Sequence, residues 1–134
     1  MICSLISGFK KGISMIDSRE LAREIAKVLD EKKAENIVAI ETEEVTIVSD
    51  VFVIANGTSN THTKSLADEV EYEIKKRLGI DPEHIEGRAS GWILLDYGTV
   101  LVHVFDRESR EYYNLERLWT DAKTLDLSDI LTED

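Results

Sequence analysis

Cysteine, proline and histidine are scarce in this sequence, and the scarcity excludes several kinds of site. Cys3 is the single cysteine among 134 residues, so the chain can form no internal disulfide and no thiolate zinc cluster. A reducing cytosol is the setting that suits such a chain. The three histidines (His62, His84 and His103) lie far apart, without the His-x-x-x-His spacing of a helical metal site.

Long hydrophobic runs and positive charge are also lacking. No apolar run approaches the ~20 residues that span a bilayer, so we expect a soluble protein without a membrane partner. Sixteen Lys and Arg face 27 Asp and Glu, a formal net charge of −11. This balance argues against binding to naked nucleic acid, whose affinity rests on basic groups. It suits a basic protein partner, although solubility alone is the explanation that we favour on charge.

The remaining composition fits one α/β domain. The apolar fraction of 43% is enough for a sizeable core. An Asp17-Ser18 cap starts a first helix, and a second is expected from about Asn60 to Leu78, ended by Gly79. Val- and Ile-rich stretches at 36–42 and 44–56 indicate strands. We therefore predict a mixed β-sheet packed by two main helices.

Composition changes at both ends of the chain. We expect residues 1–16 to be a disordered leader, and a functional chain that starts at Met15 is one interpretation. Residues 17–122 are expected to form the domain. The acidic residues 123–134 are expected to be a loosely attached tail.

The stretch GWILLDYGTVLVHVF, residues 91–105, is too apolar for a surface hairpin. With Tyr97 and Gly98 at the turn, Leu95 would pair with Val100 and Ile93 with Val102 on an aliphatic face toward the core. Tyr97 would project from the corner. The opposite face would carry a mixture of large apolar and polar groups: Trp92, Leu94, Asp96, Thr99, Leu101 and His103.

Such a mixture at the centre of a sheet is typical of a recognition patch. The alternative is that the short helix expected near residues 109–119 covers this face within the monomer. A one-residue slip in the turn would exchange the two faces. The sequence leaves both interpretations open.

The corner ANGTSN, residues 55–60, precedes the second helix. Its amides could cradle a phosphate, which would support a nucleotide-binding transferase. A cap on the helix through Ser59 or Thr58 is the simpler interpretation, because no Gly-Lys-Ser/Thr follows. His62 lies one turn into the helix, either as an acid–base group or as an exposed first-turn residue.

No catalytic set is evident elsewhere. His103 and Asp96 could orient a base, but no Ser or Cys has an activating context, and a hydrogen-bonded interface histidine is the competing interpretation. The carboxylates of residues 68–73 would spread around a helix. We therefore predict no catalysis, no cofactor and no metal.

Three long strings resemble the Iojap family, the ribosomal silencing factor RsfS. They are DVFVIANGTSNTHTKSLADEVE (residues 50–71), EGRASGWILLDYGTVLVHVF (residues 86–105) and SREYYNLERLW (residues 109–119), and they occur in the order of the family. The resemblance implies a nucleotidyltransferase-like fold without catalysis. It implies binding to ribosomal protein uL-fourteen on the large ribosomal subunit, and a steric block of joining with the small subunit when nutrients are scarce. It also implies a cytoplasmic protein that is a homodimer when free.

The resemblance also supplies site residues. It implies partner-binding roles for Trp92, Leu94, Asp96, Tyr97, Gly98, His103, Arg110 and Tyr113. The first string, residues 50–71, matches at Thr58, Ser59, Asn60 and His62. These residues either form a secondary site or hold the start of the helix. Arg110 and Tyr113 are expected at the rim of the interface.

Overall fold

The computed structural model describes residues 17–42, 49–87, 90–115, 117 and 122–131. The expected leader and residues 44–48 of the second expected strand stretch lie outside these residues. In the described part, helices and strands mix as the sequence predicted: α1 (Ser18–Glu31), β1 (Glu35–Glu41), β2 (Val51–Asn56), α2 (Asn60–Leu78), β3 (His84–Glu86), β4 (Trp92–Asp96), β5 (Val100–Phe105), α3 (Arg107–Tyr113) and β6 (Lys123–Thr124).

The two long helices begin and end where their capping residues dictate. The Asp17 carboxylate accepts from the Arg19 and Glu20 amides at the start of α1. The Ser59 hydroxyl accepts from the His62 amide at the start of α2, and Gly79 ends that helix in the left-handed conformation, with φ 73°. The predicted bounds of the second helix are therefore confirmed.

The strands form a six-stranded sheet within the described residues, in the order β3-β4-β5-β2-β1-β6. Pairing is antiparallel except between β2 and β5, which run parallel. A parallel pair needs a long crossover, here supplied by α2 and the β3–β4 ribbon. The mixed sheet with two main helices is confirmed.

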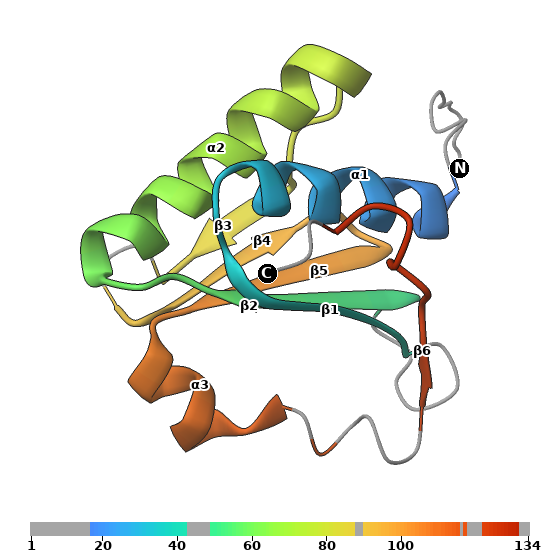
Figure 1. The fold of residues 1–134 in the computed structure, drawn as a ribbon. Coiled ribbons are helices and arrows are strands. Elements are labelled where there is room, and N and C mark those ends of the chain that lie inside the picture. Colours follow the sequence, from blue (N-terminus) through green and yellow to red (C-terminus); the bar gives the residue numbers. More distant parts are fainter. Residues whose placement is uncertain (1–16, 43–48, 88–89, 116, 118–121, 132–134) are drawn as a thin grey trace.

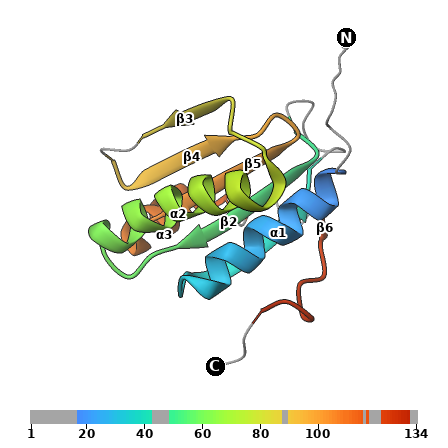
Figure 2. The same cartoon turned by 90° about the horizontal axis from the view of Figure 1, so that it is seen from above.

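Helices α1 and α2 lie side by side over one face of the sheet, and α3 lies on the opposite side (Figures 1 and 2). The main core fills the layer between these two helices and the strands. It includes Ile25, Leu66 and Val70 from the helices, and Val53 and Val102 from the strands, all buried. Burying one such side chain contributes roughly 1.5–3 kcal/mol, so this layer dominates the stability of the domain.

The C-terminal segment returns to the sheet. β6 pairs with Ile40 and Glu41 of β1, and Leu127 is buried in the main core. The Arg23 guanidinium donates to the Asp126 carbonyl at 2.8 Å. For residues 123–131 the expectation of a loosely attached tail is therefore wrong, because a short edge strand and one buried leucine anchor this segment. Residues 132–134 lie outside the described residues.

The β4–β5 hairpin turns one residue later than the sequence suggested. The Tyr97 amide donates to the Val100 carbonyl, so Gly98, with φ 89°, and Thr99 form the turn. Leu95 pairs with Val102 rather than Val100, and Ile93 pairs with Val104 rather than Val102. Moving the turn by one residue shifts the pairing by two residues, so every side chain keeps its predicted face and the expected exchange of faces does not occur.

Candidate functional site: the open face of the sheet

The sheet face opposite α1 and α2, here called the open face, carries a second apolar cluster. Ile40, Ile54 and Phe105 are fully buried in it, and Val38, Phe52, Trp92 and Leu115 pack against it while partly exposed. Leu94 and Leu101 are also partly exposed. Strand alternation places all of the strand residues on this face, because their neighbours Ile93, Leu95 and Val102 point into the main core. The structure thus brings Trp92, Leu94, Asp96, Leu101 and His103 to one face, as predicted.

A hydrogen bond between Trp92 and His103 organises the middle of this face. The indole Nε1–H of Trp92 donates to Nδ1 of His103 at 3.0 Å. Since Nδ1 accepts, the neutral imidazole carries its proton on Nε2, which is buried without a hydrogen-bond partner. Burial lowers the pKa of His103 to about 4, so the ring is neutral at pH 7.

This arrangement separates His103 from Asp96. Oδ1 of Asp96 accepts from the Gly98 amide at 2.8 Å and thereby fixes the hairpin turn. The Nδ1 atom that a carboxylate would orient is instead held by Trp92. The hydrogen bond of His103 is confirmed, its place in an interface stays a prediction, and the alternative of a His-Asp pair loses its geometric basis.

Aromatic rings extend the open face from β2 to α3. The centroids of Phe52 and His103 lie 4.6 Å apart, and those of Trp92 and Phe105 lie 5.2 Å apart. Tyr113 of α3 packs on Trp92 at 4.4 Å. Such pairs add about 0.5–1.5 kcal/mol beyond their buried area. The short helix therefore covers one end of the face, while Trp92, Phe52, Leu94 and Leu101 keep partial exposure.

Tyr97 does not project from the hairpin corner. Its side chain is only 8% exposed and belongs to the main core. The hydroxyl is buried without a hydrogen-bond partner, and burial raises the pKa of Tyr97. The expectation of a reachable Tyr97 is wrong because the turn lies one residue later, which leaves Tyr97 as the last residue on the core side of the strand.

Arg110 is not a rim residue either. It is buried, and its Nη1 donates to the carbonyl of Asn36 at 2.7 Å and to Oδ1 of Asn56 at 3.0 Å. Asn56 in turn donates through Nδ2 to Oε1 of Glu35 at 3.0 Å. Arg107 closes the group with two bonds to the Glu35 carboxylate at 2.9 and 2.7 Å, which hold the pKa of Glu35 below its usual value. This polar network fixes α3 against β1 and β2.

Sequence reasoning missed Asn56, although its side chain lies at the centre of the polar network. Its importance follows from the parallel pairing of β2 with β5, which places Asn56 beside Phe105 at the start of α3. An asparagine at the end of an apolar strand, followed by glycine, was the signal available in the sequence. Such a polar group requires partners within the fold.

Two amides of the Gly-Thr-Ser corner are engaged within the chain. The Gly57 amide donates to the Phe105 carbonyl at 2.9 Å, and the Thr58 amide donates to Nδ1 of His62 at 2.9 Å. The His62 amide donates to the Ser59 hydroxyl. Nε2 of His62 lies 3.0 Å from the Lys32 carbonyl at the end of α1. The helix-cap interpretation is confirmed. His62 joins the two long helices, a role that neither sequence interpretation included.

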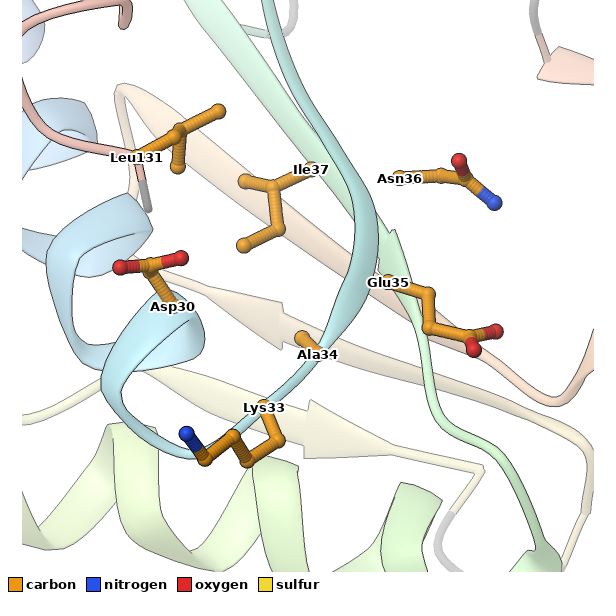
Figure 3. A pocket seen from close by; sticks show the side chains of 7 residues that line it. All are labelled: Asp30, Lys33, Ala34, Glu35, Asn36, Ile37 and Leu131. Atoms are coloured by element: carbon orange, nitrogen blue, oxygen red, sulfur yellow. The ribbon is translucent and has the colours of Figure 1, made fainter. Parts of the chain in front are cut away.

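A polar hollow of about 570 Å³ lies at the turn between α1 and β1 (Figure 3). Its lining is Asp30, Lys33, Ala34, Glu35, Asn36, Ile37 and Leu131. Figure 3 shows Glu35 and Asn36 extending from β1, away from Asp30 at the end of α1. The mostly polar lining differs from the apolar walls of typical small-molecule sites.

Two kinds of site find no support in the described ranges. Residues 17–42, 49–87, 90–115, 117 and 122–131 contain no group of three or more His, Cys, Asp or Glu side chains that could hold a metal ion. In the same ranges, no helix has the length and apolar character needed to cross a bilayer.

Comparison with known proteins places these features in a family. A family profile described as "Ribosomal silencing factor during starvation" matches residues 15–134. The ribosomal silencing factor RsfS of Halalkalibacterium halodurans is 35% identical over 118 residues, which cover 87% of this chain and 100% of that protein. A mouse protein named "Mitochondrial assembly of ribosomal large subunit protein 1" is 33% identical over 102 residues, 72% of this chain and 43% of that protein.

A solved structure agrees with the sequence matches. The crystal structure of protein CV0518 from Chromobacterium violaceum superposes with a TM-score of 0.74 at 31% identity, covering 78% of this chain and 88% of that one. The family profile spans far more than half of the chain, and the sheet and helices match a solved relative. The chain belongs to the RsfS family of ribosomal silencing factors.

Proposed function

We propose that this protein docks its open face on ribosomal protein uL-fourteen of the large ribosomal subunit and so blocks joining with the small subunit. Translation would fall when nutrients are scarce, because occupied large subunits cannot form ribosomes. Family membership supports a ribosomal role, and the name of the mouse relative points to the large subunit. We place this activity in the cytoplasm, where free subunits pair.

The observation that carries the proposal is the partly exposed apolar surface around Trp92. Trp92, Leu94, Leu101 and Phe52 share one face and retain exposure, and a central tryptophan is the residue type that most often anchors an interface. The bond to His103 and the contact with Tyr113 hold the indole in one orientation. A preordered anchor loses little conformational entropy on docking.

Charge supports a protein partner with basic groups. The net charge of −11 would accelerate encounter with a basic surface and would repel exposed RNA phosphates. A factor with this charge therefore suits a ribosomal protein better than ribosomal RNA. We expect its association rate to fall as salt rises.

Co-sedimentation with purified large subunits on a sucrose gradient tests the proposal, together with light scattering of subunit joining. The wild-type protein should migrate with large subunits and slow joining. Trp92→Ala and Leu94→Thr should weaken binding, the former by about 2 kcal/mol or more if Trp92 is a central anchor. Tyr72→Ala is the control, since Tyr72 is an exposed aromatic residue on α2, on the other side of the sheet. Wild-type protein that stays at the top of the gradient would reject the proposal.

We also infer that the chain acts by occupancy and not by catalysis. Two amides of the Gly-Thr-Ser corner, those of Gly57 and Thr58, already donate to Phe105 and His62, and the Ser59 hydroxyl accepts from the His62 amide. Titration calorimetry with nucleoside triphosphates and Mg²⁺ should therefore give no binding heat. Measurable heat that disappears in Ser59→Ala would favour a nucleotide-dependent transferase instead.

In the absence of ribosomes, we propose that two chains pair through the open face. An exposed apolar patch can bury itself against its own copy, which gives a symmetric dimer a physical cause. Sedimentation equilibrium should show a dimer that Trp92→Ala weakens. A dimer of unchanged stability in that variant would place the contact elsewhere.

A further inference from the structure

The short helix α3 exposes aromatic surface that the open face does not use. Three large hydrophobic side chains are exposed among the described residues, and two of them lie on α3: Tyr112 is 82% exposed and Tyr113 is 46% exposed. A single exposed aromatic residue is ordinary, but adjacent ones beside an apolar face form a patch. Tyr112 contributes nothing to the core and is available to a partner.

Tyr112 is held at the end of the aromatic row that begins on the open face. Its ring stands at 89° to that of Tyr113, with centroids 5.0 Å apart, and Tyr113 packs on Trp92. The polar network of Arg110, Asn56 and Glu35 fixes the helix beneath them. Tyr112 is therefore placed next to the proposed docking surface.

The exposed side of α3 is acidic. Glu108 and Glu111 are exposed, and in the described part of the chain neither forms an ion pair. Glu108 precedes Tyr112 by four residues, the spacing that puts two helical side chains on the same face. Of the two arginines of α3, Arg110 is buried, whereas Arg107 is exposed but is neutralised by its ion pair with Glu35. Beside this ion pair, α3 presents outward the ring of Tyr112 and the carboxylates of Glu108 and Glu111.

We propose that this outward surface of α3 (Glu108, Glu111 and Tyr112) receives a lysine or arginine side chain of the large-subunit protein on which the open face docks. The inference rests on the proposed function and adds the chemistry of one contact to it. A cation over the ring is attracted by the π-system, and the carboxylates add charge-assisted hydrogen bonds. Arginine fits best because its planar guanidinium can stack on the ring and bind a carboxylate at once. The net charge of −11 favours such a partner at long range.

Equilibrium binding to purified large subunits, measured at several salt concentrations, tests this contact. Tyr112→Ala should weaken binding by roughly tenfold, whereas Tyr112→Phe, which keeps the ring, should bind like wild type. The pair Glu108→Gln with Glu111→Gln should weaken binding at low salt and flatten the salt dependence. Circular dichroism should show unchanged folding, because all three side chains are exposed.

Matched controls distinguish this contact from general surface effects. Tyr72→Ala removes an aromatic side chain that is 61% exposed on α2, and Glu20→Gln with Glu24→Gln removes two carboxylates from α1. Both should leave binding unchanged. If the wild type binds, and Tyr112→Ala and the double glutamine variant bind with the same affinity, the α3 contact is overturned and the proposed function stays intact. An equal loss in the controls would also overturn it, and no binding by the wild type would reject the proposed function itself.

Discussion

Trp92 and His103, on adjacent antiparallel strands, share a 3.0 Å hydrogen bond that fixes both the indole and the imidazole tautomer. The bond leaves Nε2 of His103 buried and unpaired, a state that usually costs about 1–3 kcal/mol. The hydrogen bond therefore orders Trp92 on the open face but leaves the Nε2–H donor of His103 unsatisfied. Its consequences can be measured in the free protein.

Stability should depend on pH through His103. Its pKa is about 4 in the folded chain against 6.5 for a free imidazole, so folding favours the neutral form. The contribution is complete above pH 6.5 and is lost as pH falls toward 4, up to about 3 kcal/mol. Urea unfolding at pH 7 and pH 4.5 should show a larger loss for wild type than for His103→Asn, which keeps an acceptor but does not titrate. Equal losses in the two proteins would contradict a buried neutral imidazole.

Tyr97→Phe should leave stability unchanged or raise it by up to about 1 kcal/mol, because the hydroxyl that it removes is buried without a partner. Ribosome binding should be unaffected, since Tyr97 lies in the main core. Thermal unfolding and co-sedimentation measure the two effects. Tyr97→Ala, in contrast, should cost about 3–5 kcal/mol by leaving a cavity. A loss of binding in stable Tyr97→Phe would restore Tyr97 as a contact residue.

Asn56 and Arg110 should be energetically coupled. Asn56→Ala removes the side chain that accepts from Arg110 and donates to Glu35, so we expect a loss of about 2 kcal/mol. Arg110→Met should cost a similar amount, and the double variant should cost less than the sum by roughly 1 kcal/mol. Amide exchange in α3 should accelerate in each variant. Additive losses without faster exchange would mean that the polar network does not hold α3.

Gly57→Ala should be destabilising by about 1–3 kcal/mol, because a Cβ at this position would lie 2.8 Å from the Thr63 amide nitrogen and its Oγ1. Backbone on one side of the clash leaves little room for relaxation. Gly79→Ala is a useful comparison, since its Cβ would meet open space and only the left-handed φ of 73° resists it. Denaturant midpoints should fall in both variants, and by more in Gly57→Ala. The reverse order would show that the β2–α2 corner adjusts more freely than the structure implies.

Local chemistry in the chain made much of the fold predictable. Ser59 and Gly79 mark the ends of α2 because a hydroxyl can cap the first turn and only glycine easily adopts the left-handed conformation that ends a helix. The two faces of the β4–β5 hairpin were predictable because side chains alternate along a strand. That alternation survived a misplaced turn, since the pairing shifted by two residues and not by one.

Long-range packing determined the rest of the candidate site. Whether Arg110 would lie at a rim or in the interior depended on the distant Asn56 and Asn36, which no local pattern links to it. The contact of Tyr113 with Trp92 and the role of His62 at the end of α1 likewise join residues from separate elements.

The sequence by itself determined the α/β class, the limits of α2, the separation of the hairpin into an aliphatic and a mixed face, and the resemblance to the silencing-factor family. Only the tertiary structure decided that Tyr97 is buried, that Arg110 and Asn56 hold α3, and that Trp92 is bonded to His103. The physical reason is that caps and alternation act over a few residues. Burial and hydrogen-bond pairing depend on which distant strands and helices the fold brings together.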